Sequence, residues 1–381
     1  MTGAQPWERT ISVGTQNPPL RLVVIGCGRV TEQCHLPALQ TLAGIEIVGF
    51  VDNDRERLNK VGDQQGVGQR YSDYRAVLTD KGIDVVAVCV PPQFHAEIGL
   101  AVLAAGKHLF MEKPLALSLH EADQLVDRAA AASGKALMGF NLRWHRLIRQ
   151  ARRMIDDGSL GPVETMHTTF TSRTGFMTHG SDWRRRHDLG GSVLFDLGIH
   201  HFDLWRFLME SEVEEVFARY RADDPAIQRA TVSATMRNGV LVTASFSHGL
   251  SDTHELEICG RRRRLRLSCY RSDSLQVSEN SASHGAVADW VSGIARAFRN
   301  APQVASGWRQ GGDIIASYRA EWQHLIDTIW KNTRVQCSVE DARSALQVAL
   351  ATVESASCGQ PVRVAQAARA ITPIASALRA V

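Results

Sequence analysis

The sequence predicts an α/β protein in two parts: an N-terminal Rossmann domain built on a doubly wound parallel sheet, and a C-terminal α+β domain with a large, mostly antiparallel open sheet. Three observations lead to this prediction. Short apolar strands alternate with helical segments up to about residue 145, a glycine turn follows the first strand, and strand patterns follow one another beyond residue 160. Alternating strands and helices build parallel sheets, whereas runs of strands build antiparallel ones.

The length of 381 residues is enough for two hydrophobic cores. We expect a loose leader over residues 1–19 and a nucleotide-binding Rossmann domain over 20–145. A substrate-binding and oligomerisation domain would follow over 146–361, and an alanine-rich tail over 362–381.

The composition is typical of a soluble globular protein, with 44% hydrophobic and 22% charged residues. A net charge of +3 is too small to indicate a nucleic-acid partner, and the basic run at 261–264 lies between two strand patterns, as a hairpin tip would. No apolar run reaches the roughly 20 residues that cross a membrane. The seven cysteines are dispersed without a C-x-x-C pair, which indicates reduced thiols. We therefore expect a cytoplasmic protein without a membrane or nucleic-acid partner.

The first strand, at residues 20–25, ends in the turn Gly26-Cys27-Gly28-Arg29-Val30-Thr31 ahead of a helical pattern. Gly26 permits a tight turn, and Gly28 lets backbone N–H groups approach a pyrophosphate at the helix N-terminus. Thr31 stands where the dinucleotide fingerprint has Gly or Ala, which weakens the motif. Strand, turn and helix in this order predict a nicotinamide dinucleotide site.

The second strand, at 45–51, ends in Asp52, where a dinucleotide fold places the acid that binds the ribose hydroxyls. Asp52 would repel a 2′-phosphate and so favours NAD, whereas Arg29 and Arg55 nearby leave NADP possible. The alternative is that Asp52 caps the helix that follows it.

Further strands are expected at 84–90, 108–111 and 136–140, with a helix over 118–133. Ligands bind at the carboxyl ends of parallel strands. Five residues at such ends should therefore line one crevice: Gly26, Asp52, Pro91, Lys113 and Asn141.

A second cluster of polar side chains occupies residues 196–203. If a helix begins at about Asp196, then Asp196 and His200 lie on one face, where the carboxylate would raise the pKa of the imidazole. Two alternatives remain open: a buried pair that only cross-links the helix, and a metal site made with His201 and Asp203. Adjacent histidines on a helix point about 100° apart, so we expect no metal.

These motifs resemble, as a set, those of the Gfo/Idh/MocA oxidoreductases, which include glucose–fructose oxidoreductase and inositol dehydrogenase. The resemblance rests on the glycine turn with Asp52, on Pro91-Pro92-Gln93-Phe94-His95, on Glu112-Lys113-Pro114 after the run at 105–108, and on Asp196 with His200. It covers roughly residues 20–210, with the motifs in the family's order and spacing.

The resemblance implies a nicotinamide-dependent enzyme that acts on a sugar, a sugar derivative or a cyclitol. It implies that Lys113 is the general acid/base, that His200 assists the proton transfer, and that Asp196 orients both. The cofactor-binding residues would be Gly26, Gly28, Arg29, Val30, Asp52, Pro91, His95 and Glu112. Two alternatives share the fold: a non-catalytic NAD(P)-binding sensor, and a glycoside hydrolase that retains its NAD.

The C-terminal part should carry strands at 163–172, 213–222, 231–236, 240–247, 255–259, 265–270 and 275–278, with a hairpin at Asn238-Gly239. Its open, partly apolar face would be buried in a homodimer or homotetramer. Arg143, Trp183 and His201 are candidate substrate contacts. Helices are expected over 316–332 and, after a capping box at Ser338 and Asp341, up to residue 358.

Overall fold

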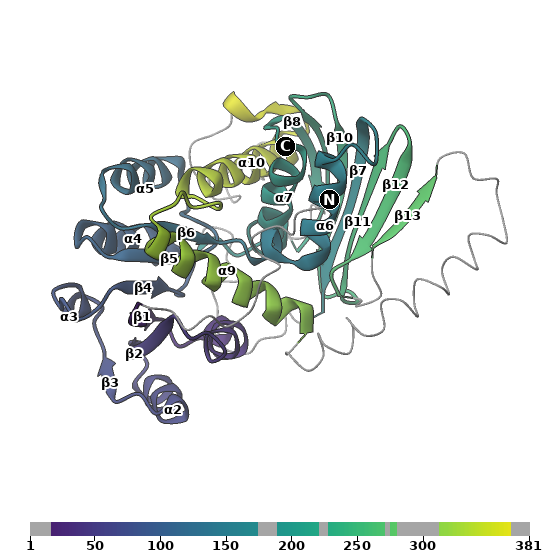
Figure 1. Ribbon diagram of the computed structural model, residues 1–381. Helices are drawn as coiled ribbons and strands as arrows, with labels where there is room; N and C mark the ends of the chain where they lie inside the picture. The colour runs from purple at the N-terminus through teal and green to yellow at the C-terminus, as the bar shows by residue number, and fades with distance from the viewer. Residues whose placement is uncertain (1–16, 174–188, 221–227, 271–274, 280–311, 367–381) are drawn as a thin grey trace, which may run out of the picture.

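The computed structural model describes residues 17–173, 189–220, 228–270, 275–279 and 312–366. Two sheets stand side by side with helices between and around them (Figure 1). The first sheet has six strands and the second has eight. This arrangement confirms the predicted α/β class with a Rossmann sheet followed by a larger, mostly antiparallel sheet.

The first sheet is parallel throughout, with the strand order β3-β2-β1-β4-β5-β6. Its strands are β1 (Leu20–Ile25), β2 (Ile45–Val51), β3 (Gln69–Tyr71), β4 (Val85–Val88), β5 (His108–Glu112) and β6 (Ala136–Gly139). Strands β2 and β3 are added on one side of β1, and β4, β5 and β6 on the other. The strand order therefore switches between β1 and β4, and doubly wound sheets bind ligands in the crevice at such a switch point. All four residues of β4 are buried, as expected of a strand that helices cover on both faces.

Helices connect these strands on both faces of the sheet (Figure 1). They are a π-helical turn η2 (Thr31–His35) that runs into α1 (Leu36–Leu39), then α2 (Arg55–Gln65), α3 (Arg75–Leu78), the 3₁₀ turn η3 (Pro92–Phe94), α4 (His95–Ala104) and α5 (Leu119–Ala131). After β6, the 3₁₀ turn η4 (Asn141–Trp144) and α6 (Arg146–Asp156) lead to the second sheet. The short strand β3 and the helix α6 were not predicted. The strand expected at 84–90 is shorter, because the chain turns at Cys89 into the loop before Pro92.

The second sheet has the order β13-β12-β11-β7-β10-β9-β8-β14. The strands are β7 (Val163–Ser172), β8 (Val213–Tyr220), β9 (Arg229–Met236), β10 (Leu241–His248), β11 (Thr253–Gly260), β12 (Arg263–Ser268), β13 (Gln276–Glu279) and β14 (Val362–Arg363). The pair β7 and β10 is parallel, and the other pairs are antiparallel. β14 pairs with β8, so the sheet extends into the stretch expected to be a tail. The basic run lies at the tip of the hairpin between β11 and β12, as predicted.

One face of the second sheet is covered by helices. α7 (Ile199–Met209) and α10 (Val339–Cys358) pack there (Figure 1). α9 (Gly312–Lys331) instead returns to the Rossmann domain, where it packs on α1, η2 and η4. α10 starts at the predicted capping box: Ser338 accepts from the backbone N–H of Asp341, whose side chain accepts in return from the N–H of Ser338.

All seven cysteines are free thiols. Within the described ranges, no helix combines the length and the apolar character that a membrane span needs.

Candidate functional site

The glycine turn after β1 leaves no room for a side chain at its first position. A Cβ atom on Gly26 would lie 2.4 Å from the backbone O of Cys89, and its φ of +97° suits glycine. At Gly28, by contrast, nothing lies within 4 Å of where a Cβ would be. Buried Thr31 donates from Oγ1 to the backbone O of Gly26 at 2.6 Å. Thr31 therefore stabilises the turn from the fingerprint position where a glycine or alanine is usual.

Asp52 lies at the end of β2 and faces this turn. Its Oδ2 accepts from the backbone N–H of Cys27 at 2.8 Å, and its Oδ1 from the N–H of Asp54 at 2.9 Å. The alternative that Asp52 caps α2 is wrong, because Asp54 is the N-cap and accepts from the N–H of Arg57. The arginine next to Asp52 is Arg57, whose Nη1 lies 3.6 Å from Asp52 Oδ2. From the sequence, Arg29 and Arg55 were expected nearby.

These features fit a nicotinamide dinucleotide. Gly26, Gly28, Arg29 and Val30 form one turn at the start of a helical segment, with open space above Gly28 and a carboxylate at the end of the neighbouring strand. Backbone N–H groups and the helix N-terminus suit a pyrophosphate, and a carboxylate suits ribose hydroxyls.

Glu112 is the last residue of β5, and His95 is the first residue of α4. The Nε1–H of Trp322 donates to His35 Nδ1 at 3.1 Å, so the proton of neutral His35 is on Nε2, which donates to Glu112 Oε1 at 2.9 Å. His95 has both ring nitrogens against backbone carbonyls, of Pro114 at 2.6 Å and Val90 at 2.8 Å. His95 thus ties the loop after Pro91 to the Glu112-Lys113-Pro114 loop, rather than facing open space as a cofactor ligand would.

Lys113 reaches across from the Rossmann domain to the C-terminal domain. Its Nζ donates to the backbone O of Asp196 at 2.7 Å and to its Oδ1 at 3.0 Å. The two side chains keep 14% and 23% of their surface exposed, so the pair lies at the edge of the crevice. Lys113 and Pro114 are joined by a cis peptide bond. The structure therefore brings together two residues that are 83 positions apart in the chain.

His248, at the end of β10, was not among the predicted site residues. Its Nε2 lies 3.2 Å from Asp196 Oδ2, and its Nδ1 lies 2.7 Å from Gln228 Oε1. The side chain is almost fully buried, with 2% exposed. The carboxylate of Asp196 is thus held on one oxygen by Lys113 and on the other by His248. A strand-end histidine 52 residues from Asp196 carries no local sequence signal of this contact.

His200 lies half-buried near the same group, with its ring edge-on to Phe140 at 5.9 Å. Its pKa lies well below the usual range, because burial disfavours the charged ring and Lys113 adds repulsion. Asp196 acts in the opposite direction but is outweighed. The predicted upward effect of Asp196 on the pKa of His200 is therefore present, but it does not decide the net direction. His200 Nδ1 is buried and has no hydrogen-bond partner within the described part of the chain.

The local backbone also differs from the expected helix start. A π-helical turn, η7 (Leu194–Gly198), precedes α7. Its wider turn changes the angular spacing that places residues four apart on one face of an α-helix. Asp196 accordingly pairs with Lys113, which follows β5, and with His248 of β10.

Two of the predicted substrate-contact residues, Arg143 and His201, bind other side chains of the protein instead. Arg143 is 4% exposed and donates from Nε to Asp203 Oδ2 at 2.7 Å, and Asp341 Oδ2 lies 3.2 Å from its Nη1. His201 is fully buried, with Nε2 3.1 Å from His254 Nε2, and burial lowers its pKa to about 3. Neither can reach a substrate in the crevice, because both are held in the core. Trp183 lies outside the described residues. No cluster of three or more metal-capable side chains occurs among the residues described.

The chain matches two family models. Residues 20–140 match the "Oxidoreductase family, NAD-binding Rossmann fold" model, and residues 148–266 match the GFO/IDH/MocA C-terminal domain. Similar proteins include the myo-inositol 2-dehydrogenase of Thermotoga maritima, 30% identical over 52% of this chain and 58% of that protein. The D-apiose dehydrogenase of Rhizobium rhizogenes is 27% identical over 90% of this chain and 97% of that protein.

A solved structure shares the fold over nearly its whole length. Levoglucosan dehydrogenase, in complex with NADH and levoglucosan, aligns over 91% of this chain and 100% of its own with a TM-score of 0.78 and 21% identity. With both domain models matched in order, the chain belongs to the Gfo/Idh/MocA family of NAD(P)-dependent oxidoreductases.

Proposed function

We propose that the protein is an NAD-dependent dehydrogenase or reductase acting on a secondary hydroxyl or ketone of a sugar, sugar derivative or cyclitol. One observation supports this most directly. The ammonium group of Lys113 is held by Asp196 at the carboxyl edge of the Rossmann sheet, beside His200 and near the turn that fits the cofactor.

The chemistry requires one hydride and one proton to leave the substrate alcohol. Bound NAD would supply the hydride acceptor at the carbinol carbon. In alcohol oxidation Lys113 would act as the neutral amine and take the hydroxyl proton onto Nζ, and in ketone reduction its ammonium group would donate that proton to the oxygen. Asp196 fixes the direction of the lysine through two hydrogen bonds. His200, neutral because its pKa is low, can accept or donate a hydrogen bond to a substrate hydroxyl.

His248 acts as a positioning residue in this proposal. A carboxylate held by a single partner can rotate about its terminal bond. With His248 on Oδ2 and Lys113 on Oδ1, the carboxylate plane is fixed. Gln228 holds the other side of the histidine ring, and such a supporting contact keeps a catalytic group oriented.

The names of similar proteins support a polyhydroxylated substrate. They include a D-glucoside 3-dehydrogenase of Escherichia coli and an apo scyllo-inositol dehydrogenase from Lactobacillus casei. Asp52 supports NAD over NADP, because its carboxylate is only 7% exposed, accepts two backbone N–H groups and would repel a 2′-phosphate.

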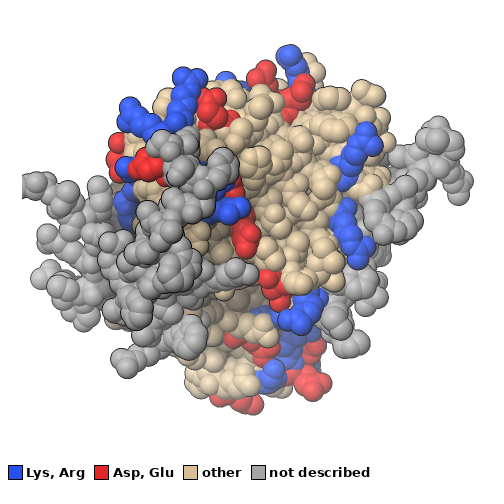
Figure 2. All heavy atoms as spheres, turned by 90° about the vertical axis from the view of Figure 1, so that its right-hand side faces the viewer, with Lys and Arg blue, Asp and Glu red and all other residues tan. Residues whose placement is uncertain are grey.

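We also propose that the uncovered face of the second sheet is buried by a second copy of the chain. Figure 2 shows that the described part of this side of the molecule is largely uncharged. The outward positions on β7, β9 and β10 carry mainly hydroxyl side chains, so this face is less apolar than expected: Thr165, Thr169, Thr231, Ser233, Thr243 and Ser245. A broad face of small side chains suits the flat contact of a two-fold interface.

The activity is tested with purified protein, NAD or NADP, and a panel of sugars, sugar acids and cyclitols, by following the absorbance of reduced nicotinamide. The Lys113→Met variant should bind NADH normally, measured by fluorescence, but lose about 100- to 10,000-fold in turnover. Lys81→Met, at an exposed lysine, is the matched control. Near-normal turnover in Lys113→Met would contradict the assigned role.

A further inference from the structure

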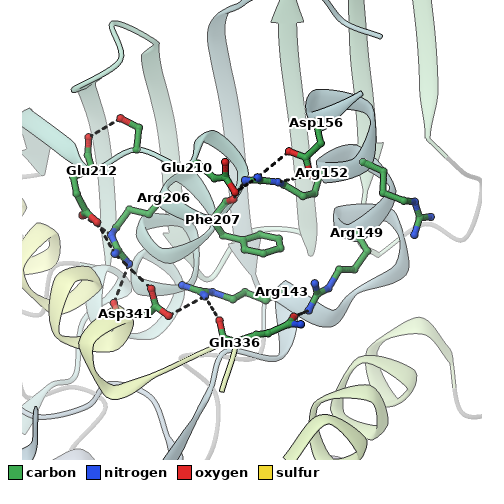
Figure 3. Close-up of a pocket in the computed structure, with 12 residues that line it drawn as sticks. Arg143, Arg149, Arg152, Asp156, Arg206, Phe207, Glu210, Glu212, Gln336 and Asp341 are labelled. Atoms are coloured by element: carbon green, nitrogen blue, oxygen red, sulfur yellow. Dashed lines mark hydrogen bonds and ion pairs between the residues drawn. The ribbon is translucent and has the colours of Figure 1, made fainter. Parts of the chain in front are cut away.

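A cavity of about 470 Å³ opens at the C-terminal end of α7, the end opposite to Asp196 (Figure 3). It is lined by side chains of α6, of α7 and of the segment from Gln336 to Asp341. Five arginines contribute to the wall, around the ring of Phe207: Arg143, Arg149, Arg152, Arg153 and Arg206. The proposed reaction uses none of them.

Arg143, Arg152 and Arg206 each have carboxylate partners. Arg206 binds Glu212 through two hydrogen bonds, of 2.6 and 2.7 Å. Arg143 pairs with Asp203 and Asp341. Arg152 pairs with Asp156 and with Glu210. These ion pairs fix the walls of the cavity, as the dashed lines in Figure 3 show.

Arg149 differs from these three. Its Nη2 donates to Gln336 Oε1 at 3.1 Å, and no carboxylate lies within 4.0 Å of it among the described residues. Its guanidinium lies 4.3 Å from the ring centre of Trp144 and 5.3 Å from that of Phe207. The two rings hold the guanidinium in place by cation–π contacts.

The surroundings of Arg149 disfavour its positive charge. Burial lowers its pKa to about 10, and nearby Arg143, Arg152 and Arg153 act in the same direction. The group is still protonated at neutral pH, so its charge is half-buried without a counter-charge from the described chain. An anion in the cavity would supply that charge.

We propose that this cavity binds a small oxyanion, the phosphate or carboxylate group of a soluble metabolite, with Arg149 as its principal ligand. Guanidinium groups bind such oxyanions through two parallel hydrogen bonds, and a preoriented guanidinium loses little entropy in doing so. Gln336 can contribute its amide N–H₂. The volume exceeds that of a bare phosphate and lies in the range of small-molecule sites. Because Arg206 lies ten residues beyond Asp196, about 15 Å along a helix, the site is separate from the reacting groups.

The proposal is tested by calorimetric titration of inorganic phosphate and, separately, of malonate into protein saturated with NADH. Sodium chloride keeps the ionic strength constant. Saturation with NADH blocks the glycine turn, the other place where a phosphate could bind. Wild-type protein should bind one equivalent of phosphate, malonate or both. Arg149→Met, which keeps an unbranched apolar side chain but removes the guanidinium, should weaken that binding by at least tenfold, or about 1.4 kcal/mol.

Arg128→Met is the matched control, because Arg128 is an exposed arginine on α5. It should leave anion binding unchanged. Arg149→Lys keeps the positive charge but lacks the two parallel N–H donors of the guanidinium, so it should bind the anion with intermediate affinity. Such binding would show that the loss in Arg149→Met comes from the missing guanidinium and not from misfolding. Unchanged affinity in Arg149→Met, or no anion binding by folded wild-type protein beyond that of chloride, would overturn the proposal. These outcomes do not depend on whether the protein turns over any sugar.

Discussion

The indole ring of Trp322 stacks on the ring of Phe110, with centroids 4.3 Å apart, and both side chains are fully buried. Trp322 belongs to α9 and Phe110 to β5, so this pair ties the returning helix to the Rossmann sheet. We expect Trp322→Ala to lower the free energy of unfolding by about 3–5 kcal/mol. Denaturant unfolding measures the change. Trp330→Ala, at a 36% exposed position of the same helix, should cost much less, and equal losses in the two variants would argue against this role.

His248 should affect turnover without affecting cofactor binding. In His248→Ala the carboxylate of Asp196 loses its partner on Oδ2, and we expect kcat to fall about 10- to 100-fold, as for other supporting contacts. The NADH dissociation constant should stay unchanged. His248→Gln, which can still donate from its amide, should recover part of the rate. A fall in folded fraction that accounts for the whole loss would indicate a purely structural role, and circular dichroism distinguishes the two.

Stability should fall as the pH falls from 7 to 5. Burial lowers the pKa of His201 to about 3 and that of His145 to about 4, whereas both titrate near 6.5 when unfolded. The unfolded chain therefore binds more protons below pH 6.5, and the stabilisation present above that pH is lost on acidification. At pH 5, each of these two histidines should lower the free energy of unfolding by about 2 kcal/mol.

Urea unfolding at pH 7 and pH 5 measures how the free energy of unfolding depends on pH. In His201→Phe this free energy should fall less between pH 7 and pH 5 than in the wild type, whatever the change in absolute stability. His120→Ala removes an exposed histidine on α5 and should leave the pH dependence as in the wild type. An unchanged pH dependence in His201→Phe would mean that His201 is not the group that titrates.

Asp52 should set the preference between the two nicotinamide cofactors. Asp52→Ala removes a carboxylate that faces the ribose position, together with its hydrogen bonds to Cys27 and Asp54. We expect NAD binding to weaken at least tenfold. The preference for NAD over NADP, measured as the ratio of their dissociation constants, should decrease. Asp54→Ala, at the neighbouring helix cap, serves as the control. If the ratio of the two dissociation constants does not change, Asp52 does not contact the ribose.

The uncovered sheet face can be tested by adding one charge. Ser245 lies opposite Thr169 on neighbouring strands of this face, so Ser245→Glu places an unpaired carboxylate within the proposed interface. Light scattering should show a dimer or tetramer for the wild type and a smaller species for this variant. Gln124→Glu adds the same charge on the exposed side of α5 and should have no effect. A monomeric wild type would rule the interface out.

Much of the fold was predictable because local patterns agree with the tertiary structure. β1 and β2 have the predicted bounds, and the capping box at Ser338 starts α10 as expected. β3 was missed because its three residues are only partly buried and carry no apolar run. β14 was missed because a two-residue strand is created by pairing with β8, a contact that the local sequence does not specify.

The site was predictable where short motifs specify the backbone, and not where contacts come from distant strands. The grouping of Lys113 with Asp196 was expected from the resemblance of their motifs to those of the family. The contact of His248 with Asp196 depends on the register of β10 in a sheet whose parallel partner, β7, is far away in sequence. The net effect on the pKa of His200 depends on burial, which helical spacing alone does not reveal.

Because Lys113 directly follows β5 and Asp196 lies in η7, their bond spans the boundary between the two domains. A relative displacement of little more than about 1 Å takes such a contact beyond hydrogen-bonding distance. The pair therefore depends on how the two domains are placed relative to each other. Under the proposed mechanism, mutations far from the crevice that shift the two domains relative to each other would slow turnover without touching a reacting atom.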